Sequence, residues 1–200
     1  MKSFPHGFHF RQAVAGDIPR LQVLIDISVR TLQAGDYSPS QVEGALGSHL
    51  GVDTTLIEDG TYFVLEHACA VRDAPLVASG GWSRRKTLCG GDCGTGRDDA
   101  LLDPKTEPAK IRAFYVHPDW ARKGIGTAIL ERCEEAARAE GFTRFEMGAT
   151  LTGVPLYLRC GYAARERREL PLANGGSLPI VRMVKGDVAS GDDDSVFRHG

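Results

Sequence analysis

The sequence predicts a mixed α/β fold in a single domain. Strand-like segments alternate with segments of helical periodicity, and residues 109–151 form one strand–helix–strand unit in the middle of the chain. A chain of 200 residues can bury a substantial core without disulfides. We therefore assign residues 1–185 to one domain, with an excursion at about 84–108, and the polar, acidic residues 186–200 to a disordered tail.

The domain begins with a predicted strand over residues 8–14 and a helix that follows Asp17. Asp17 suits an N-cap, a proline stands in the first turn, and apolar residues recur at helical spacing. These apolar residues are Leu21, Leu24, Ile25, Val29 and Leu32. Residues 35–50 predict a loop and a second helix, with Ser38 or Ser40 as its cap.

Strand signals follow, and then the pattern breaks down. We expect a short strand over residues 54–57, a turn at 58–60, a strand at Thr61–Glu66 and another strand within 73–82. Residues 84–108 are rich in Gly, Asp and Pro. Because strand signals resume directly after them, they predict an excursion from the domain rather than a linker, and long loops of this kind are often functional.

The carboxy-terminal part predicts a strand over 109–118 and a helix that runs from the glycines of 124–126 to Glu140. In that helix Ile129, Cys133, Ala136 and Ala137 form one buried stripe, while the charged residues, Glu134 among them, are expected to face elsewhere. Gly141 suits the left-handed position after the helix. The remaining elements are a strand at 141–151, a short helix at 152–160 capped by Thr152, and two strands joined by the Asn174–Gly175 turn.

Composition excludes several classes of protein. The formal net charge of −2 argues against a general nucleic-acid binder. The five scattered cysteines do not predict a disulfide scaffold, and no second ligand pair at zinc spacing follows Cys89 and Cys93, so we expect no metal. Residues 1–10 lack a signal-peptide pattern, and no apolar run approaches the ~20 residues of a membrane span. We expect a cytoplasmic protein without a membrane partner.

The stretch WARKGIGTAIL, Trp120–Leu130, predicts an anion site at the start of a helix. Helix amino termini carry unpaired N–H groups and partial positive charge. Gly124 and Gly126 have no Cβ, so a large anion can approach those groups, and Arg122 and Lys123 add charge. A general nucleotide-phosphate binder is disfavoured, because no Lys-Ser/Thr follows and Ile129 takes the place of the third glycine of a dinucleotide fingerprint.

Taken together, three segments resemble the GNAT N-acetyltransferases. FYVHPDWARKGIGTAIL is similar to that family's acyl-CoA-binding motif, FTRFEMGATL to its fifth strand, and PLYLRCGY to its FYxxxGF segment. FRQAVAGDIPRL is similar to its first strand and helix, so the resemblance covers roughly residues 8–185. It implies one mixed, mostly antiparallel sheet flanked by helices, in which the central parallel strands four and five splay apart around coenzyme A.

The resemblance also implies roles for individual residues. Acetyl-CoA is the implied cosubstrate, with its pantetheine arm along the backbone of Phe114, Tyr115 and Val116 and the Phe114 N–H polarising the acetyl carbonyl. Tyr157 matches the family's tyrosine general acid, which protonates the leaving thiolate. The pyrophosphate is expected on the backbone N–H groups of Arg122, Lys123, Gly124, Ile125, Gly126 and Thr127.

Three positions depart from the family pattern. Ala121 stands where Gln or Arg is usual, and Thr150 where an Asn that contacts coenzyme A is common. We keep Thr150 as a candidate cofactor contact. Lys110 occupies a slot where some members carry a catalytic Glu or His, which leaves the general base unassigned among Glu66, Glu107, His117 and Glu146.

The acceptor is also left open. Tyr37, Ser38 and Trp82 are candidates for its pocket, each with core packing as the alternative. The leading hypothesis is an N-acetyltransferase that transfers the acetyl group to a primary amine of a small molecule or a protein, by direct attack in a ternary complex. The alternative is a non-catalytic module that binds or senses acyl-CoA. A homodimer is the expected assembly if the chain follows many members of the family.

Overall fold

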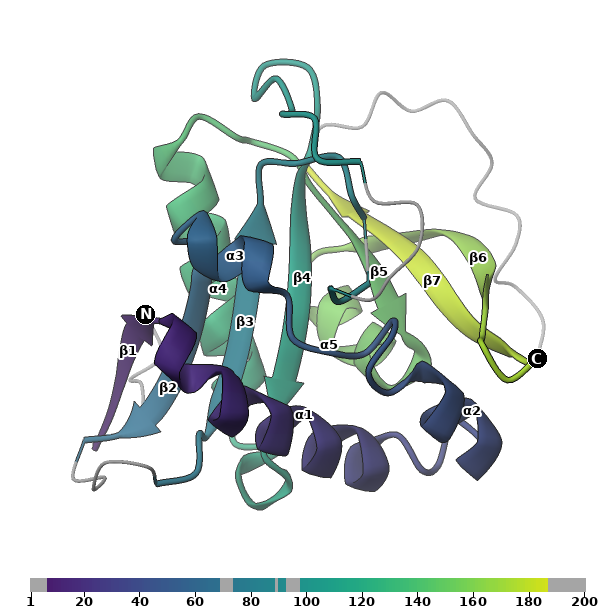
Figure 1. Ribbon diagram of the computed structural model, residues 1–200. Coiled ribbons are helices and arrows are strands. Elements are labelled where there is room, and N and C mark those ends of the chain that lie inside the picture. The colour runs from purple at the N-terminus through teal and green to yellow at the C-terminus, as the bar shows by residue number, and fades with distance from the viewer. Residues whose placement is uncertain (1–6, 69–73, 89, 93–97, 187–200) are drawn as a thin grey trace.

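A seven-stranded sheet runs through the molecule in the order β1-β2-β3-β4-β5-β7-β6 (Figure 1). The strands are β1 (Phe8–Gln12), β2 (Tyr62–His67), β3 (Ala78–Ser83), β4 (Ala109–Val116), β5 (Phe145–Thr150), β6 (Ala163–Pro171) and β7 (Ser177–Lys185). All neighbouring pairs are antiparallel except β4 and β5, which are parallel. The predicted mixed, mostly antiparallel sheet is confirmed. The computed structural model describes residues 7–68, 74–88, 90–92 and 98–186, so the predicted tail and the Cys89/Cys93 pair lie outside the described residues.

Helices cover both faces of this sheet, with α1 to α3 on one face and α4 and α5 on the other (Figure 1). The α-helices are α1 (Ile18–Leu32), α2 (Pro39–Ala45), α3 (Thr54–Glu58), α4 (Ile125–Ala139) and α5 (Val154–Arg159). Short 3-10 turns precede three of them: η1 (Ala15–Asp17), η2 (Pro118–Trp120) and η3 (Leu151–Gly153). The core therefore consists of two apolar layers separated by the sheet.

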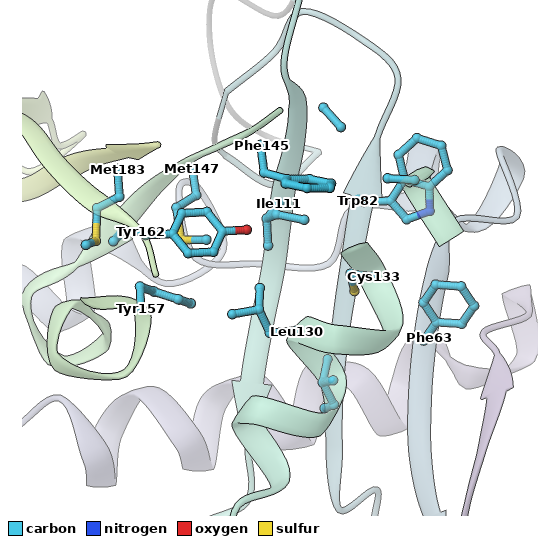
Figure 2. Close-up of a cluster of buried hydrophobic side chains, with 14 of the residues drawn as sticks. Phe63, Trp82, Ile111, Leu130, Cys133, Phe145, Met147, Tyr157, Tyr162 and Met183 are labelled. Atoms are coloured by element: carbon cyan, nitrogen blue, oxygen red, sulfur yellow. The ribbon is translucent and has the colours of Figure 1, made fainter. Parts of the chain in front are cut away.

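The layer under α4 and α5 is built on the predicted stripe of α4. Ile129, Cys133 and Ala137 are fully buried in the cluster that contains Phe145 and Ile111. Figure 2 shows Cys133 with these two sheet residues. Each fully buried aliphatic side chain contributes roughly 1.5–3 kcal/mol relative to an exposed one. The stripe fixes the height of α4 above β3 and β4, and with it the position of the loop at the start of α4.

Glu134 corrects the prediction for the polar face of α4. Its side chain is buried, and its carboxylate accepts hydrogen bonds from the Tyr162 hydroxyl at 3.0 Å and from Lys185 Nζ at 2.8 Å. Arg138 adds a third contact at 2.7 Å. A buried carboxylate is tolerated only when it is paired in this way. Glu134 therefore joins α4 to the chain beyond α5 and to β7.

The predicted short strand at residues 54–57 is wrong, because these residues form α3. Its Leu56 is completely buried under β3, and the backbone N–H of Thr54 donates to Asp92 Oδ1 at 2.8 Å. A segment of five residues shows no usable period, so tertiary contacts override the strand preference of its β-branched residues.

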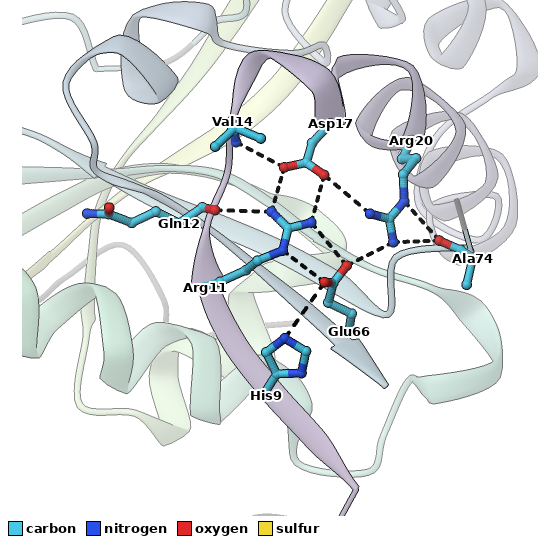
Figure 3. Close-up of polar contacts among 8 residues, drawn as sticks. All are labelled: His9, Arg11, Gln12, Val14, Asp17, Arg20, Glu66 and Ala74. Carbon is cyan, nitrogen blue, oxygen red and sulfur yellow. Dashed lines mark hydrogen bonds and ion pairs between the residues drawn. The ribbon is translucent and has the colours of Figure 1, made fainter. Parts of the chain in front are cut away.

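Of the three predicted helix caps, one is confirmed, and the other two side chains form different contacts. Ser38 caps α2, accepting a hydrogen bond from the N–H of Gln41. Thr152 instead donates to Asp36 Oδ2 at 2.6 Å and does not cap α5. Asp17 stands before α1, but its carboxylate accepts from the N–H of Val14 at 2.9 Å and pairs with Arg11 at 2.6 Å (Figure 3). The Asp17 carboxylate, which was predicted to cap α1, is thus engaged in an ion pair instead.

Candidate functional site

The parallel pairing of β4 and β5 stops after two residue pairs, Ala109 with Phe145 and Lys110 with Glu146. Beyond them β4 continues alongside β3, whereas β5 continues alongside β7 as far as Thr150. The two strands therefore separate toward their carboxyl ends. The backbone groups of β4 on the edge away from β3 face this gap instead of a partner strand.

A bulge distorts β4 at the same place. Ser79 pairs with Tyr115 and Gly81 with Arg112, so β4 carries one more residue than β3 between these pairs. Ala113 in this bulge has φ of 53°, a left-handed conformation that is uncommon for a residue with a side chain. Bulges redirect the backbone and side chains beside them, and they are frequent next to active sites. Here the residue redirected is Phe114.

A pocket occupies the gap between the two strands. Phe114 lines it from β4, Met147 and Thr150 from β5, and Tyr157 from α5. Gln33 at the end of α1 and the segment from His49 to Gly51 complete it from the opposite face of the sheet. The pocket thus brings together four of the residues predicted from the sequence: Phe114, Tyr115, Thr150 and Tyr157.

Tyr157 lines this pocket from α5 (Figure 2), and its ring is in edge-to-face contact with Phe114 at 5.9 Å between ring centroids. Its hydroxyl forms no hydrogen bond with any residue that the structure describes. Burial raises the pKa of the Tyr157 hydroxyl well above its usual range, so the group keeps its proton at neutral pH. A protonated hydroxyl without a protein partner can donate to a group bound in the pocket.

The predicted anion site forms an exposed loop at the start of α4. Arg122 has φ of 64° and Gly124 has φ of 84°, both left-handed, and the helix begins at Ile125. The first bond into the helix runs from Ala128 N–H to the carbonyl of Gly124, which leaves the preceding N–H groups at the open end. Lys123 lies over the Trp120 ring at 4.6 Å. Positive charge and N–H groups therefore meet at one exposed surface.

The two glycines of this loop lie in different surroundings, so glycine is favoured at each position for a different reason. A Cβ on Gly124 would meet no atom within 4 Å, so the space above this residue is open. A Cβ on Gly126 would lie 2.9 Å from Leu156 Cδ2, so a side chain at this position would force Leu156 of α5 to move. The prediction that both glycines allow an anion to approach fits Gly124, while the constraint on Gly126 is internal packing.

Comparison with protein families identifies this arrangement. Residues 58–164 match the family model described as "Acetyltransferase (GNAT) domain". The chain belongs to the GNAT acetyltransferase family. The matched segment contains the splayed strands, the bulge, the anion loop and Tyr157. A comparison with curated protein sequences gives no significant match.

Solved structures share the fold of this GNAT chain. A GCN5-related N-acetyltransferase from Rhodopseudomonas palustris is 19% identical with a TM-score of 0.66, over 94% of this chain and 100% of the other. PaiA N-acetyltransferase from Thermoplasma acidophilum, in complex with coenzyme A, is 13% identical with a TM-score of 0.58, over 90% and 99%. YncA from Salmonella typhimurium, with its cofactor acetyl-CoA, is 14% identical with a TM-score of 0.58, over 96% and 100%.

The GNAT domain uses the four predicted base candidates for structure. Glu66 pairs with Arg11 and Arg20 in the cluster that joins β1, β2 and α1 (Figure 3). Glu146 accepts from Lys110 and Arg182 where β4 and β5 are still paired. Glu107 Oε2 accepts from the N–H of Asp103 at 2.8 Å, and His117 caps η2 by accepting from the N–H of Asp119. None of the four lines the pocket.

The three predicted acceptor-pocket candidates also lie elsewhere. The buried Tyr37 hydroxyl donates to the carbonyl of Pro179 and accepts from the N–H of Leu151, each at 2.8 Å. Ser38 is the cap of α2, and Trp82 is buried against Phe142. These residues position the elements around the pocket without lining it.

Gln33 and His49 line the pocket and were missed by sequence reasoning. His49 Nε2 lies 2.8 Å from the carbonyl of Pro171. Because a carbonyl only accepts, Nε2 carries the proton, and in the neutral ring Nδ1 holds the lone pair. No local motif marks either residue. They reach the pocket because the end of α1 and the loop after α2 cross the sheet where β4 and β5 separate.

Among the residues that the structure describes, no helix is both long and apolar enough to cross a bilayer. The same part of the chain contains no group of three or more His, Cys, Asp or Glu side chains that could hold a metal ion. Cys133 is buried and Cys160 half-buried, and both are free thiols.

Proposed function

We propose that this GNAT protein is an N-acetyltransferase that transfers the acetyl group of acetyl-CoA to a primary amine by direct attack in a ternary complex. The observation that carries the proposal is the gap between β4 and β5, which brings the bulge beside Phe114 and the Tyr157 hydroxyl into one pocket, where that hydroxyl has no partner among the described residues. The coenzyme A and acetyl-CoA in the PaiA and YncA structures, which share the fold, support it.

The anion loop fits a pyrophosphate. Gly124 has open space above it, and Arg122 and Lys123 are exposed beside the N–H groups of Ile125, Gly126 and Thr127. These N–H groups, together with the helix dipole, stabilise negative charge. We assign the loop Arg122–Thr127 to the pyrophosphate, the backbone of Phe114, Tyr115 and Val116 to the pantetheine arm, and Thr150 to a further contact in the gap.

Acetyl-CoA supplies an activated acetyl group with a thiolate as its leaving group. The N–H of Phe114 stabilises the oxyanion that develops when the amine attacks, as a preorganised backbone donor. The Tyr157 hydroxyl gives its proton to the departing sulfur, and the pocket holds both reactants in position. In this mechanism Tyr157 is the proton donor to the sulfur, and no carboxylate is needed for that step.

We assign the proton acceptor for the amine to His49. A primary ammonium has a pKa near ~10.4 and must lose a proton before it attacks. None of the described residues that line the pocket is Asp or Glu, and the tautomer of His49 leaves Nδ1 with its lone pair. In this assignment His49→Asn lowers kcat about 100-fold for alkylamines. It lowers kcat much less for an acceptor amine that is already neutral at the assay pH, and an equal loss for both would overturn the role.

The test of the proposed function is release of CoA from acetyl-CoA across a broad amine panel, measured with a thiol reagent. Turnover that requires both the amine and intact Tyr157 supports the enzyme. Tight acetyl-CoA binding by calorimetry with no turnover of any amine would favour the non-catalytic sensing module instead. The cytoplasmic location and the homodimer expected from the sequence remain predictions.

A further inference from the structure

One polar group in the pocket is not used by the proposed acetyl transfer. Gln33 lines the pocket from the end of α1 and is 7% exposed. Its Oε1 is buried without a hydrogen-bond partner among the described residues. Leaving such a group unpaired costs about 1–3 kcal/mol, so buried amides nearly always have partners. This amide is therefore positioned to bind a ligand.

The backbone of Gln33 is fixed, which distinguishes the residue from a loose surface glutamine. Its N–H donates to the carbonyl of Val29 at 3.2 Å, and its carbonyl accepts from Asp36 at 3.0 Å and from Tyr37 at 3.1 Å. Tyr37 is in turn held by the carbonyl of Pro179. The main chain thus places the side-chain amide at the pocket, while the amide itself stays available.

Much of the lining of this pocket is aliphatic. Leu50, Ile111, Leu178 and Ile180 are all buried and line the pocket, and Leu170 completes the wall. No Asp, Glu or Lys is among the lining residues within the part of the chain that the structure describes. An acceptor with a second ammonium group would find no carboxylate here, and burying that charge unpaired is costly.

The guanidinium of Arg112, which lines the pocket, is already paired. Arg112 contacts Asp53 at 2.6 Å and donates to the carbonyls of Thr87 and Gly90. An acceptor that carries a carboxylate would have to break these contacts to reach a positive charge. Among the described lining residues no charge is left without its partner, which selects against charged bodies of either sign.

We propose that Gln33 binds the reacting amine of the acceptor, and that the acceptor class is a primary amine on an apolar, otherwise uncharged body. The inference rests on the proposed N-acetyltransferase function. The amide oxygen accepts a hydrogen bond from the amine N–H, while the Leu and Ile side chains cover the rest of the molecule. Gln33 acts in acceptor binding and takes no part in binding acetyl-CoA.

The experiment compares phenethylamine, spermidine and glutamate as acceptors for the full-length chain, with CoA release as the readout. Phenethylamine is expected to have a kcat/KM at least tenfold above the other two. Gln33→Met is expected to raise the KM for phenethylamine about tenfold, with acetyl-CoA affinity and melting temperature unchanged. Gln22→Met, an exposed position on the same helix outside the pocket lining, is the matched control.

The outcomes separate the two proposals. Turnover that prefers spermidine or glutamate would overturn the acceptor class while leaving the acetyltransferase intact. Equal KM values for the Gln33 and Gln22 variants would overturn the role of Gln33. No CoA release with any amine would count against the acetyltransferase function itself.

Discussion

The two ends of the β4–β5 pair are built in opposite ways. At the closed end, Lys110 and Arg182 donate to the buried Glu146, and the strands are joined by backbone pairing. At the open end, β4 bulges at Ala113, the strands separate, and the hydroxyl of Tyr157 has no partner among the described residues. The β4–β5 pair thus has partners for its charged and backbone groups at the closed end, whereas at the open end the two strands are not paired with each other.

This contrast shows where ligand-binding capacity resides. Charged groups at the closed end are paired with one another, so they contribute to stability and are not available to act on a substrate. At the open end, Gln33 Oε1 and the Tyr157 hydroxyl have no hydrogen-bond partner among the described residues, so a bound molecule is needed to complete them. Changes at the closed end should therefore alter stability alone, and changes at the open end should alter binding or rate alone.

The largest expected effect is at the closed end. Glu146→Gln leaves the ammonium of Lys110, whose side chain is 9% exposed, without its carboxylate. Breaking a buried ion pair in this way lowers the free energy of unfolding by about 3 kcal/mol. Urea unfolding measures the loss. We expect kcat of the folded fraction to change little, and a large loss of kcat would restore Glu146 as a base.

The pH dependence sharpens this prediction. Burial alone would raise the pKa of Glu146, but its contacts with Lys110 and Arg182 prevail and hold that pKa below its usual value of 4.5. The stabilisation is therefore fully present above the unfolded pKa of Glu146, and it is lost as pH falls through the lower folded pKa. The gap between the wild type and Glu146→Gln should shrink in acid. Glu169→Gln, at an exposed pair, should show no such gap.

The next effect is at the open end and concerns rate. Tyr157→Phe removes a hydroxyl that has no partner among the described residues, so stability should hold while kcat falls about 100-fold. Tyr162→Phe is the matched control, because its hydroxyl donates to Glu134 at 3.0 Å. That variant should lose about 1–3 kcal/mol of stability and keep its kcat. Reversed effects would exchange the roles of the two tyrosines.

Most of the fold could be predicted from the sequence, because long periodic segments such as α1, α4 and β7 carry their own signal. The short α3 could not, since its five residues show no period and are held by Leu56 and Asp92. The anion loop and Tyr157 were identified through local motifs. Gln33, His49 and the pairing of Glu146 were not, because each depends on contacts between segments far apart in the sequence.

A smaller effect is expected at the anion loop. Gly124→Val should weaken acetyl-CoA binding about tenfold, since a branched side chain would fill the open space beside the N–H groups. Gly175→Val is the matched control, because Gly175 has the same φ of 84° and the same open surroundings in the β6–β7 turn. Both variants place a side chain at positive φ, so their stabilities should fall alike. Equal acetyl-CoA affinities by calorimetry would remove the phosphate assignment.

The smallest expected effect concerns kcat in alkaline solution, which should not change with pH. A proton donor loses activity as pH rises through its pKa, and an ordinary tyrosine would do so near ~10. Burial raises the pKa of Tyr157 above that range, so its proton is retained. With an acceptor amine that is already neutral, kcat should therefore stay flat from about pH 8 to about pH 10. A decline within this range that disappears in Tyr157→Phe would mean that water reaches the hydroxyl, and the open end would then be less enclosed than its burial indicates.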